Sequence, residues 1–209
     1  MIYKDYKYIY PPRPENTFPR DGMDKFDNDV FVAQPKFNGS CTDVYCGPDL
    51  WKTMNRHKQP LTGCKLTKNE FEVIIPKKGN NLIVGEYMNK SKKDEFGKVF
   101  NHKLMIFDVL VIDGEYLIGK TFQERLDILY EMFIFEDEND YSLKITDNIY
   151  MTKSFYKGFS ELWDKLVTID MIEGLVLKRK DAGLELGLTE KNNTRSMLKC
   201  RKSTKNYNY

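Results

Sequence analysis

Short apolar segments with strand-like composition, separated by turn residues, constrain the fold of this chain more than any other feature. Runs of this kind, bounded by Gly, Pro, Asn or Asp, are typical of β-strands. Asp113-Gly114 follows the longest run and predicts a tight turn with a returning strand. The predicted strands are residues 30–36, 71–75, 81–88, 103–113, 115–119 and 174–180.

Helical periodicity is clear in two segments. Thr121 and Glu124 form a T-x-x-E capping box, and apolar residues follow at helical spacing as far as Phe133. The second helix is predicted over residues 158–169, where the apolar side chains share one face. Because the predicted strands outnumber the helices and do not alternate with them, we expect an α+β fold with mainly antiparallel sheets flanked by helices.

Length and composition fit one domain. The chain has 209 residues, of which 41% are hydrophobic, so we expect a single domain over residues 1–209. Residues 1–28 are predicted to be an irregular N-terminal lead-in, and residues 191–209 a basic C-terminal tail. No apolar run is long enough to span a bilayer, and the N-terminus lacks the apolar core of a signal peptide. We therefore expect no membrane partner and a cytoplasmic location, which is the host cytoplasm if the protein is viral.

The four cysteines form no C-x-x-C pair. They are predicted to be isolated, reduced thiols. A zinc site made of Cys46, His57 and Cys64 remains an alternative, although its spacing matches no common zinc pattern.

Charge is unevenly distributed along the chain. The net charge is only +2, which neither indicates nor excludes a nucleic-acid partner, because local patches decide this. The acidic segment 136–140 is predicted to be a solvated loop. The basic residues between 191 and 205 are Lys191, Arg195, Lys199, Arg201, Lys202 and Lys205.

Residues whose side chains could take part in catalysis or binding recur at or near predicted strands. Taken alone, Lys36 in the segment QPKFNGS is an ordinary lysine beside an Asn-Gly turn. Phe107 is equally consistent with a core residue, and Glu86 with a solvated strand end. The segments that follow in order are IVGEYM with Glu86, MIFDVLVIDG with Phe107 and Asp108, EGLVLKRK with Glu173 and Lys178, and SMLKCRKS with Lys199 and Arg201.

This ordered set resembles the motifs of the covalent nucleotidyltransferase superfamily, which includes ATP-dependent DNA and RNA ligases and mRNA capping enzymes. The motifs K-x-D/N-G, an Arg-containing segment, G-E, aromatic-Asp, E-G-x-V-x-K and K-x-K occur here in that order and span residues 34–201. The resemblance implies a nucleotidyltransferase domain of the ATP-grasp-like ligase adenylation type. It is similar to a small, phage-type ligase, and no OB domain is expected within these residues.

The resemblance implies ATP, Mg²⁺ (or Mn²⁺) and a lysyl-AMP intermediate on Lys36. A lysine nitrogen can hold AMP as a phosphoramidate between two half-reactions. A free lysine titrates near ~10.4, and neighbouring cations lower that value. Glu173 would hold the metal, and Asn38 would do so directly or through water. The nucleotide contacts implied are Gln34 at the adenine edge, Arg56 at the ribose or an incoming 5′-phosphate, Glu86 at the ribose hydroxyls, Phe107 on the base, and Lys178, Lys199 and Arg201 at the phosphates.

The partner implied is a nucleic acid with 5′-phosphate and 3′-hydroxyl ends. A further protein is an additional possible partner in place of the OB domain, and the oligomeric state is open. Asn38 and Cys41 depart from the K-x-D-G-x-R form of many DNA ligases. Together with the last motif, they favour RNA ends over DNA ends. The residues implied to contact the strand are Arg56, Arg195, Lys202 and Lys205.

Three other functions remain open at this point. One is an ATP-dependent DNA ligase that seals nicked duplexes. The second is a capping-type guanylyltransferase, which would take GTP. The third is an inactive nucleotide- or strand-binding module, although retention of Lys36, Glu86 and Glu173 argues against it.

Overall fold

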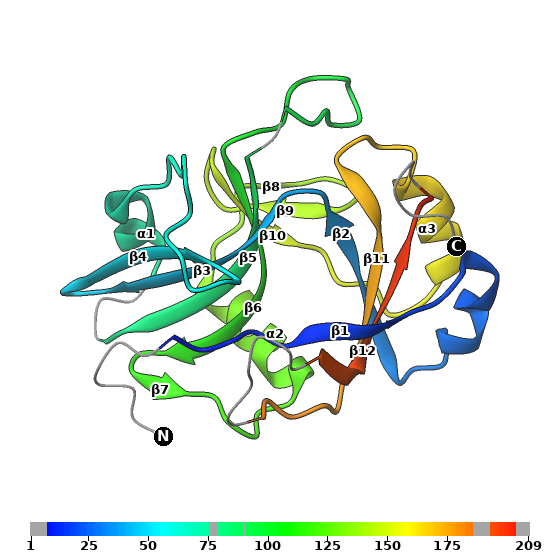
Figure 1. The fold of residues 1–209 in the computed structure, drawn as a ribbon, viewed down its shortest axis with the longest axis horizontal. Helices are drawn as coiled ribbons and strands as arrows, with labels where there is room; N and C mark the ends of the chain where they lie inside the picture. Colours follow the sequence, from blue (N-terminus) through cyan, green and yellow to red (C-terminus); the bar gives the residue numbers. More distant parts are fainter. Residues whose placement is uncertain (1–7, 76–78, 90, 186–192, 204–209) are drawn as a thin grey trace.

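Two β-sheets lie side by side in the computed structural model, which describes residues 8–75, 79–89, 91–185 and 193–203 (Figure 1). The smaller sheet has the order β1-β12-β11-β2. Its strands are β1 (Arg13–Thr17), β12 (Asn193–Arg201), β11 (Ile172–Arg179) and β2 (Phe31–Phe37). The larger sheet has the order β4-β3-β5-β6-β10-β9-β8, with β7 paired to β6. Its strands are β3 (Ser40–Gly47), β4 (Leu50–Asn55), β5 (Asn81–Met88), β6 (Lys103–Ile112), β7 (Glu115–Tyr116), β8 (Asp137–Glu138), β9 (Ser142–Lys144) and β10 (Ile149–Thr152).

Helices cover the outer sides of the sheets. The helix α3 (Phe159–Leu166) and the 3₁₀ helix η1 (Arg20–Phe26) pack against the smaller sheet through buried Met23 and Phe159. The helices α1 (Lys68–Ile74) and α2 (Phe122–Met132) belong to the core of the larger sheet. None of the helices in the described ranges is long and apolar enough to cross a membrane.

The chain passes from one sheet to the other at Asn38-Gly39, between β2 and β3. Residue Lys36 is therefore the next-to-last residue of a strand in the smaller sheet, while Glu86 lies on β5 of the larger sheet. Since β11 is the neighbour of β2, Glu173 lies beside Lys36. The crossover thus brings the predicted motifs to the junction of the two sheets.

The predicted α+β class is confirmed, with mostly antiparallel pairing. Strands occur within residues 30–36, 81–88, 103–113, 115–119 and 174–180, as expected. Two pairings, β1 with β12 and β10 with β6, are parallel. The capping box at Thr121 and Glu124 forms, and α3 begins after Gly158. Strands β3, β4, β8, β9 and β10 were not predicted.

The predicted strand at residues 71–75 is wrong, because this segment lies in and just after α1. Thr67 and Glu70 form a capping box that starts the helix, with the same signal that was used at Thr121. A half-buried strand would bury alternate residues. Here Phe71 and Ile75 are buried, but Val73 between them is 85% exposed.

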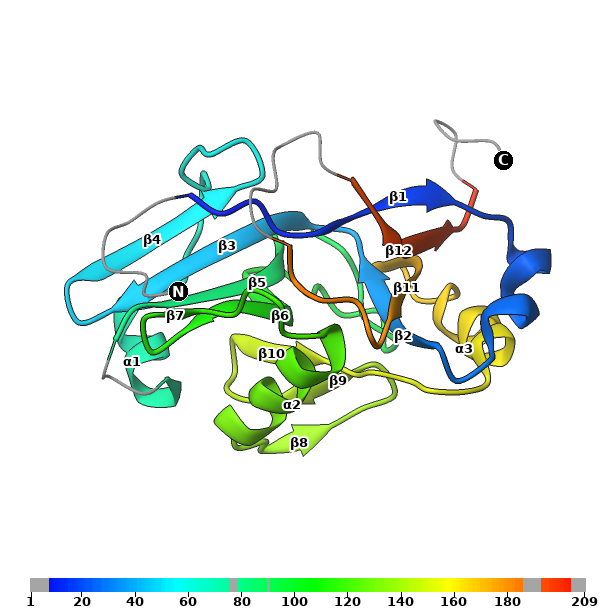
Figure 2. The ribbon, with the colours of Figure 1, turned by 90° about the horizontal axis from the view of Figure 1, so that it is seen from below.

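The described residues near the two chain ends contain more regular structure than predicted. Residues 8–17 connect both sheets: the Tyr8 hydroxyl donates to the carbonyl of Asn55, and β1 pairs with β12 (Figure 2). The predicted irregular lead-in therefore contains β1 and η1. The predicted basic tail is also a strand over Asn193–Arg201, because apolar Met197 and Cys200 are buried. Residues 204–209 lie outside the described residues.

Gly174 is required where β11 lies against β12. Its φ is +150°, and a Cβ there would lie 1.9 Å from the carbonyl oxygen of Cys200. We expect Gly174→Ala to lower the free energy of unfolding by at least about 2 kcal/mol, measured by urea denaturation. The matched control is Gly22→Ala, whose Cβ would meet its nearest neighbour, Phe18, at 3.7 Å. Equal effects of the two substitutions would show that the close approach at Gly174 is unimportant.

Candidate active site

A cleft of about 540 Å³ lies at the junction of the two sheets. This volume is in the range of small-molecule sites. All ten residues predicted to act on the nucleotide or metal line it: Gln34, Lys36, Asn38, Arg56, Glu86, Phe107, Glu173, Lys178, Lys199 and Arg201.

Lys36, Glu173 and Arg201 form a row of charges on three neighbouring strands. Gly174 pairs in register with both Lys36 and Arg201, so Glu173 is adjacent to both cations. One oxygen of Glu173 accepts from Lys36 Nζ and the other from Arg201 Nη2. Burial raises the pKa of Glu173, but Lys36 and Arg201 outweigh burial and hold this pKa below its usual value. The carboxylate is therefore ionised in the cleft.

Lys199 adds positive charge to the same strand, β12. Its pKa is lowered by burial and by the neighbouring cations Arg201 and Lys36. The cleft thus concentrates three cations around one carboxylate. An arrangement of this kind favours polyanionic ligands such as phosphates.

Glu86 faces this row from the larger sheet. Its Oε1 accepts from the backbone N–H of Gly39 at 3.0 Å, which fixes the carboxyl against the β2–β3 turn. Burial raises the pKa of Glu86 to about 7, against opposing effects of Lys36 and the Gly39 N–H. Glu86 therefore exchanges its proton near neutral pH.

A pH-dependent stability follows from Glu86. Between its ordinary pKa of 4.5 and about 7, the folded protein retains a proton that the unfolded chain has lost. The stability contributed by this group is thus present below pH 4.5 and is lost as pH rises through 7. We expect Glu86→Gln to gain about 3 kcal/mol relative to wild type between pH 4.5 and pH 8.

This expectation is checked by urea denaturation at several pH values. The control is the exposed Glu161, replaced by Gln, for which the difference from wild type should stay flat. A flat difference for Glu86→Gln as well would contradict the assignment.

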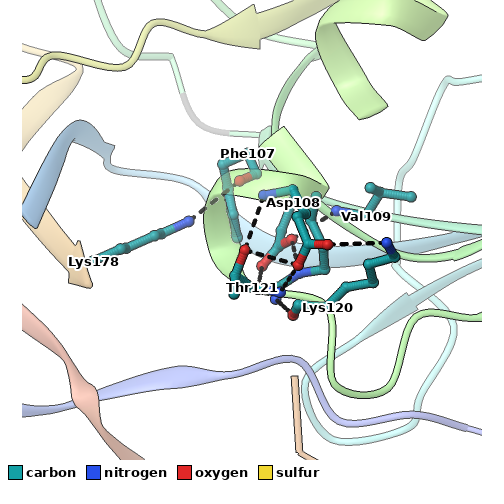
Figure 3. A network of polar contacts seen from close by, with 8 residues as sticks. Phe107, Asp108, Val109, Lys120, Thr121 and Lys178 are labelled. Carbon is teal, nitrogen blue, oxygen red and sulfur yellow. Dashed lines mark hydrogen bonds and ion pairs between the residues drawn. The ribbon is translucent and has the colours of Figure 1, made fainter. Parts of the chain in front are cut away.

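Phe107 and Lys178 form the opposite end of the cleft. Lys178 Nζ lies 4.7 Å from the centroid of the Phe107 ring and donates to the Phe107 carbonyl at 3.2 Å (Figure 3). Burial lowers the pKa of Lys178 to about 8. Gln34 is buried and pairs in register with Val176, which also lines the cleft. An aromatic face with buried hydrogen-bonding groups suits a nucleobase.

Asp108, next to Phe107, makes a contact that the sequence analysis missed. It pairs with Arg125 of α2 through two hydrogen bonds of 2.8 and 3.0 Å. Arg125 also donates to the Lys120 carbonyl at 2.8 Å. Both side chains are 4% exposed. One sequence signal could have revealed this pair. Arg125 lies on the apolar face of a predicted helix, between Phe122 and Leu126.

The residues predicted to contact a nucleic-acid strand lie in different parts of the structure. Arg56 lines the cleft next to His57, with 3.0 Å between Nε and Nε2. Arg195 is exposed on β12. Lys202 donates to the carbonyls of Val167 and Ile169, so the structure places its ammonium group at the end of α3. Lys205 lies outside the described residues.

The donor chemistry of the cleft fits Mg²⁺ but not zinc. No three His, Cys, Asp or Glu side chains converge as a metal site in the described part of the chain, so Cys46, His57 and Cys64 do not form the alternative zinc site. Mg²⁺ is usually bound by one or two carboxylates together with substrate phosphates and water. Ionised Glu173, with Asn38 also on the cleft wall, meets that requirement.

Comparisons with known proteins identify the class. The family model described as "ATP dependent DNA ligase domain" matches residues 17–201. The fold and cleft therefore define an adenylyltransferase domain of the covalent nucleotidyltransferase type. The chain belongs to the ATP dependent DNA ligase domain family.

Solved structures with this fold come from both DNA and RNA ligases. A mycobacterial DNA ligase D complexed with ATP and MES is similar, with a TM-score of 0.64, 15% identity and coverage of 91% of this chain and 59% of that chain. A Lig E DNA ligase has a TM-score of 0.55, 16% identity and coverage of 93% and 70%. An archaeal ATP-dependent RNA ligase has a TM-score of 0.51, 14% identity and coverage of 91% and 47%.

The chain thus spans 59% of the length of the DNA ligase D structure. A comparison of the sequence with curated proteins found no match.

Proposed function

We propose that this chain is the adenylyltransferase domain of an ATP-dependent polynucleotide ligase, which joins a 5′-phosphate to a 3′-hydroxyl through AMP bound to Lys36. The observation that carries the proposal is the position of Lys36. Its Nζ lies in the cleft against ionised Glu173, within the electrostatic influence of Lys199 and Glu86. No other lysine of the cleft is paired with a carboxylate in the part of the chain that the structure describes.

The chemistry proceeds in three displacements at phosphorus. Lys36 Nζ attacks the α-phosphorus of ATP, forms a P–N bond, loses a proton and displaces pyrophosphate. A 5′-phosphate oxygen of the strand then attacks the same phosphorus and takes AMP from the lysine. Finally, the 3′-hydroxyl attacks the 5′-phosphate and releases AMP, with loss of its proton.

The chain's own residues support these steps. Arg201 and Lys199 offset charge that develops on the phosphates and on the leaving pyrophosphate. Glu173 orients the Lys36 ammonium before the nucleotide enters, and it is the carboxylate that would hold Mg²⁺. The metal would neutralise phosphate charge when bound.

The nucleoside is proposed to lie along the cleft toward Phe107, with its base stacked on that ring. Glu86 accepts hydrogen bonds from the ribose hydroxyls, and Gln34 contacts the adenine edge. Lys178 lies beside the Phe107 ring, so we place it at the base rather than at the phosphates expected from the motif. Arg56 in the cleft and the exposed Arg195 of β12 contact the nucleic acid, with Lys202 and Lys205 farther along the chain.

Two nucleic-acid substrates are candidates, RNA ends and nicked DNA. Cys41 stands on the cleft wall where many DNA ligases have an arginine, and this favours RNA ends. The matched family is described as a DNA ligase domain, and this favours nicked DNA. A panel of nicked and single-stranded RNA, DNA and hybrid substrates, each incubated with ATP and Mg²⁺, separates them. Sealing of all-DNA nicks alone would reject the RNA assignment.

A covalent-labelling assay separates ligation from capping. We expect α-labelled ATP, and not α-labelled GTP, to label the protein. Label from GTP alone would establish a guanylyltransferase. Strand binding without label from either nucleotide would establish a binding module.

A further inference from the structure

The side-chain amide of Gln34 is held in one orientation. Its Nε2 donates to the hydroxyl oxygen of Ser154 at 3.0 Å. Its Oε1 is buried and has no hydrogen-bond partner among the described residues. Leaving a buried acceptor unpaired is unfavourable. The amide therefore presents an acceptor that a ligand donor would satisfy.

Ser154 is fixed by the backbone next to Gln34. The following residue, Phe155, exchanges two hydrogen bonds with Ala33, from Ala33 N to Phe155 O at 2.8 Å and from Phe155 N to Ala33 O at 2.9 Å. Residues 154 and 155 thus lie beside β2, next to Gln34. Any sliding of residues 154–155 along β2 would break these two hydrogen bonds. Ser154 and Gln34 therefore stay next to each other.

The Ser154 oxygen accepts from the NH₂ end of the Gln34 amide. The carbonyl end of the amide is therefore left for the ligand.

We propose that Ser154 is a positioning residue that fixes the acceptor end of Gln34 and so makes the cleft prefer a 6-amino purine. This inference rests on the proposed function, because it concerns the nucleotide that reacts with Lys36. A 6-amino group donates to Gln34 Oε1. A 6-oxo group would place two acceptors against each other, and a hydrogen-bonding site of this kind discriminates strongly.

The test compares covalent labelling by ATP and ITP, which differ at position 6 of the purine. We expect Ser154→Ala to reduce the preference for ATP over ITP by about tenfold, because the amide can then reverse. The reduced preference should appear as a smaller difference between the half-saturating concentrations of ATP and ITP. The maximal labelling rate for ATP should be unchanged. Ser154→Thr keeps the hydroxyl and should restore the preference.

A double-substitution cycle isolates the coupling. In a Gln34→Ala background, Ser154→Ala should have no further effect on the preference, because no amide remains to be oriented. An unchanged preference in Ser154→Ala, or additive losses in the double variant, would overturn the inference. Equal losses for ATP and ITP in the maximal rate would indicate a purely structural role and would also overturn it.

Failure of the proposed function is distinguishable. Wild-type protein that forms no covalent adduct with either nucleotide contradicts the function. Calorimetric binding of ATP and ITP to the same variants then still decides the inference, since binding needs no chemistry at Lys36.

Discussion

Replacement of Lys36 by alanine is expected to reduce covalent labelling by α-labelled ATP by about 1,000-fold or more. The reason is that no other nitrogen can replace a nucleophile whose position is set by the β2–β11 register and by Glu173. Lys36→Arg should fail equally, because a guanidinium stays protonated. The measurement is the label retained on the denatured protein after incubation with ATP and Mg²⁺.

The fold should survive these substitutions, since Glu173 keeps its pair with Arg201. Circular dichroism and thermal melting check this. The matched control is Lys157→Ala. The side chain of Lys157 is 79% exposed, and its ion pair with Asp29 is long, at 4.0 Å. It should label like wild type. Retained labelling of a folded Lys36→Ala protein would move the nucleophile to another residue.

Replacement of Asp108 by alanine is expected to lower the free energy of unfolding by about 3–5 kcal/mol. The substitution leaves Arg125 with a buried, uncompensated charge, because both partners are 4% exposed. It also frees α2 from β6 directly behind Phe107. Urea denaturation gives the free energy, and the midpoint of thermal unfolding should fall by about 10 °C.

An exposed pair of the same kind is the control. Arg179 and Asp181 are bonded at 2.7 Å but are 47% and 64% exposed. Asp181→Ala should therefore cost about 1 kcal/mol or less. Replacing both Asp108 and Arg125 by leucine should recover most of the lost stability. A cost of Asp108→Ala as small as that of Asp181→Ala would contradict the role assigned to the buried pair.

The motif positions were predictable from the sequence because they lie in or beside strands with strong apolar patterns. Lys36 and Glu86 lie toward the ends of such runs and Glu173 directly precedes one. The pairing of β2 with β11 then places Lys36 and Glu173 side by side. The resemblance supplied their order, and the sheet register supplied their proximity. The helix at Thr121 was predictable for the same reason, since its capping box is local.

Residues 71–75 have strand composition, but the local capping box of Thr67 and Glu70 starts a helix there, so a sequence signal was available. Other features that were missed depend on contacts between distant residues. The β12 strand has the charge of a tail and is ordered by pairing with β1 and β11. Similarly, Ser154 has no local signature, since it gains its role only by contact with Gln34. The only local signal of Arg125 was its place on an apolar helix face, and its partner Asp108 is distant in the sequence.

Mass spectrometry of the protein digested after incubation with ATP and Mg²⁺ tests the central claim most directly. It detects AMP whether the lysine was modified during purification or during the incubation. We predict one AMP on the peptide that contains Lys36, assigned to that residue by fragmentation. AMP on another residue, such as Lys178 or Lys199, or an unmodified Lys36 under these conditions, would contradict the account.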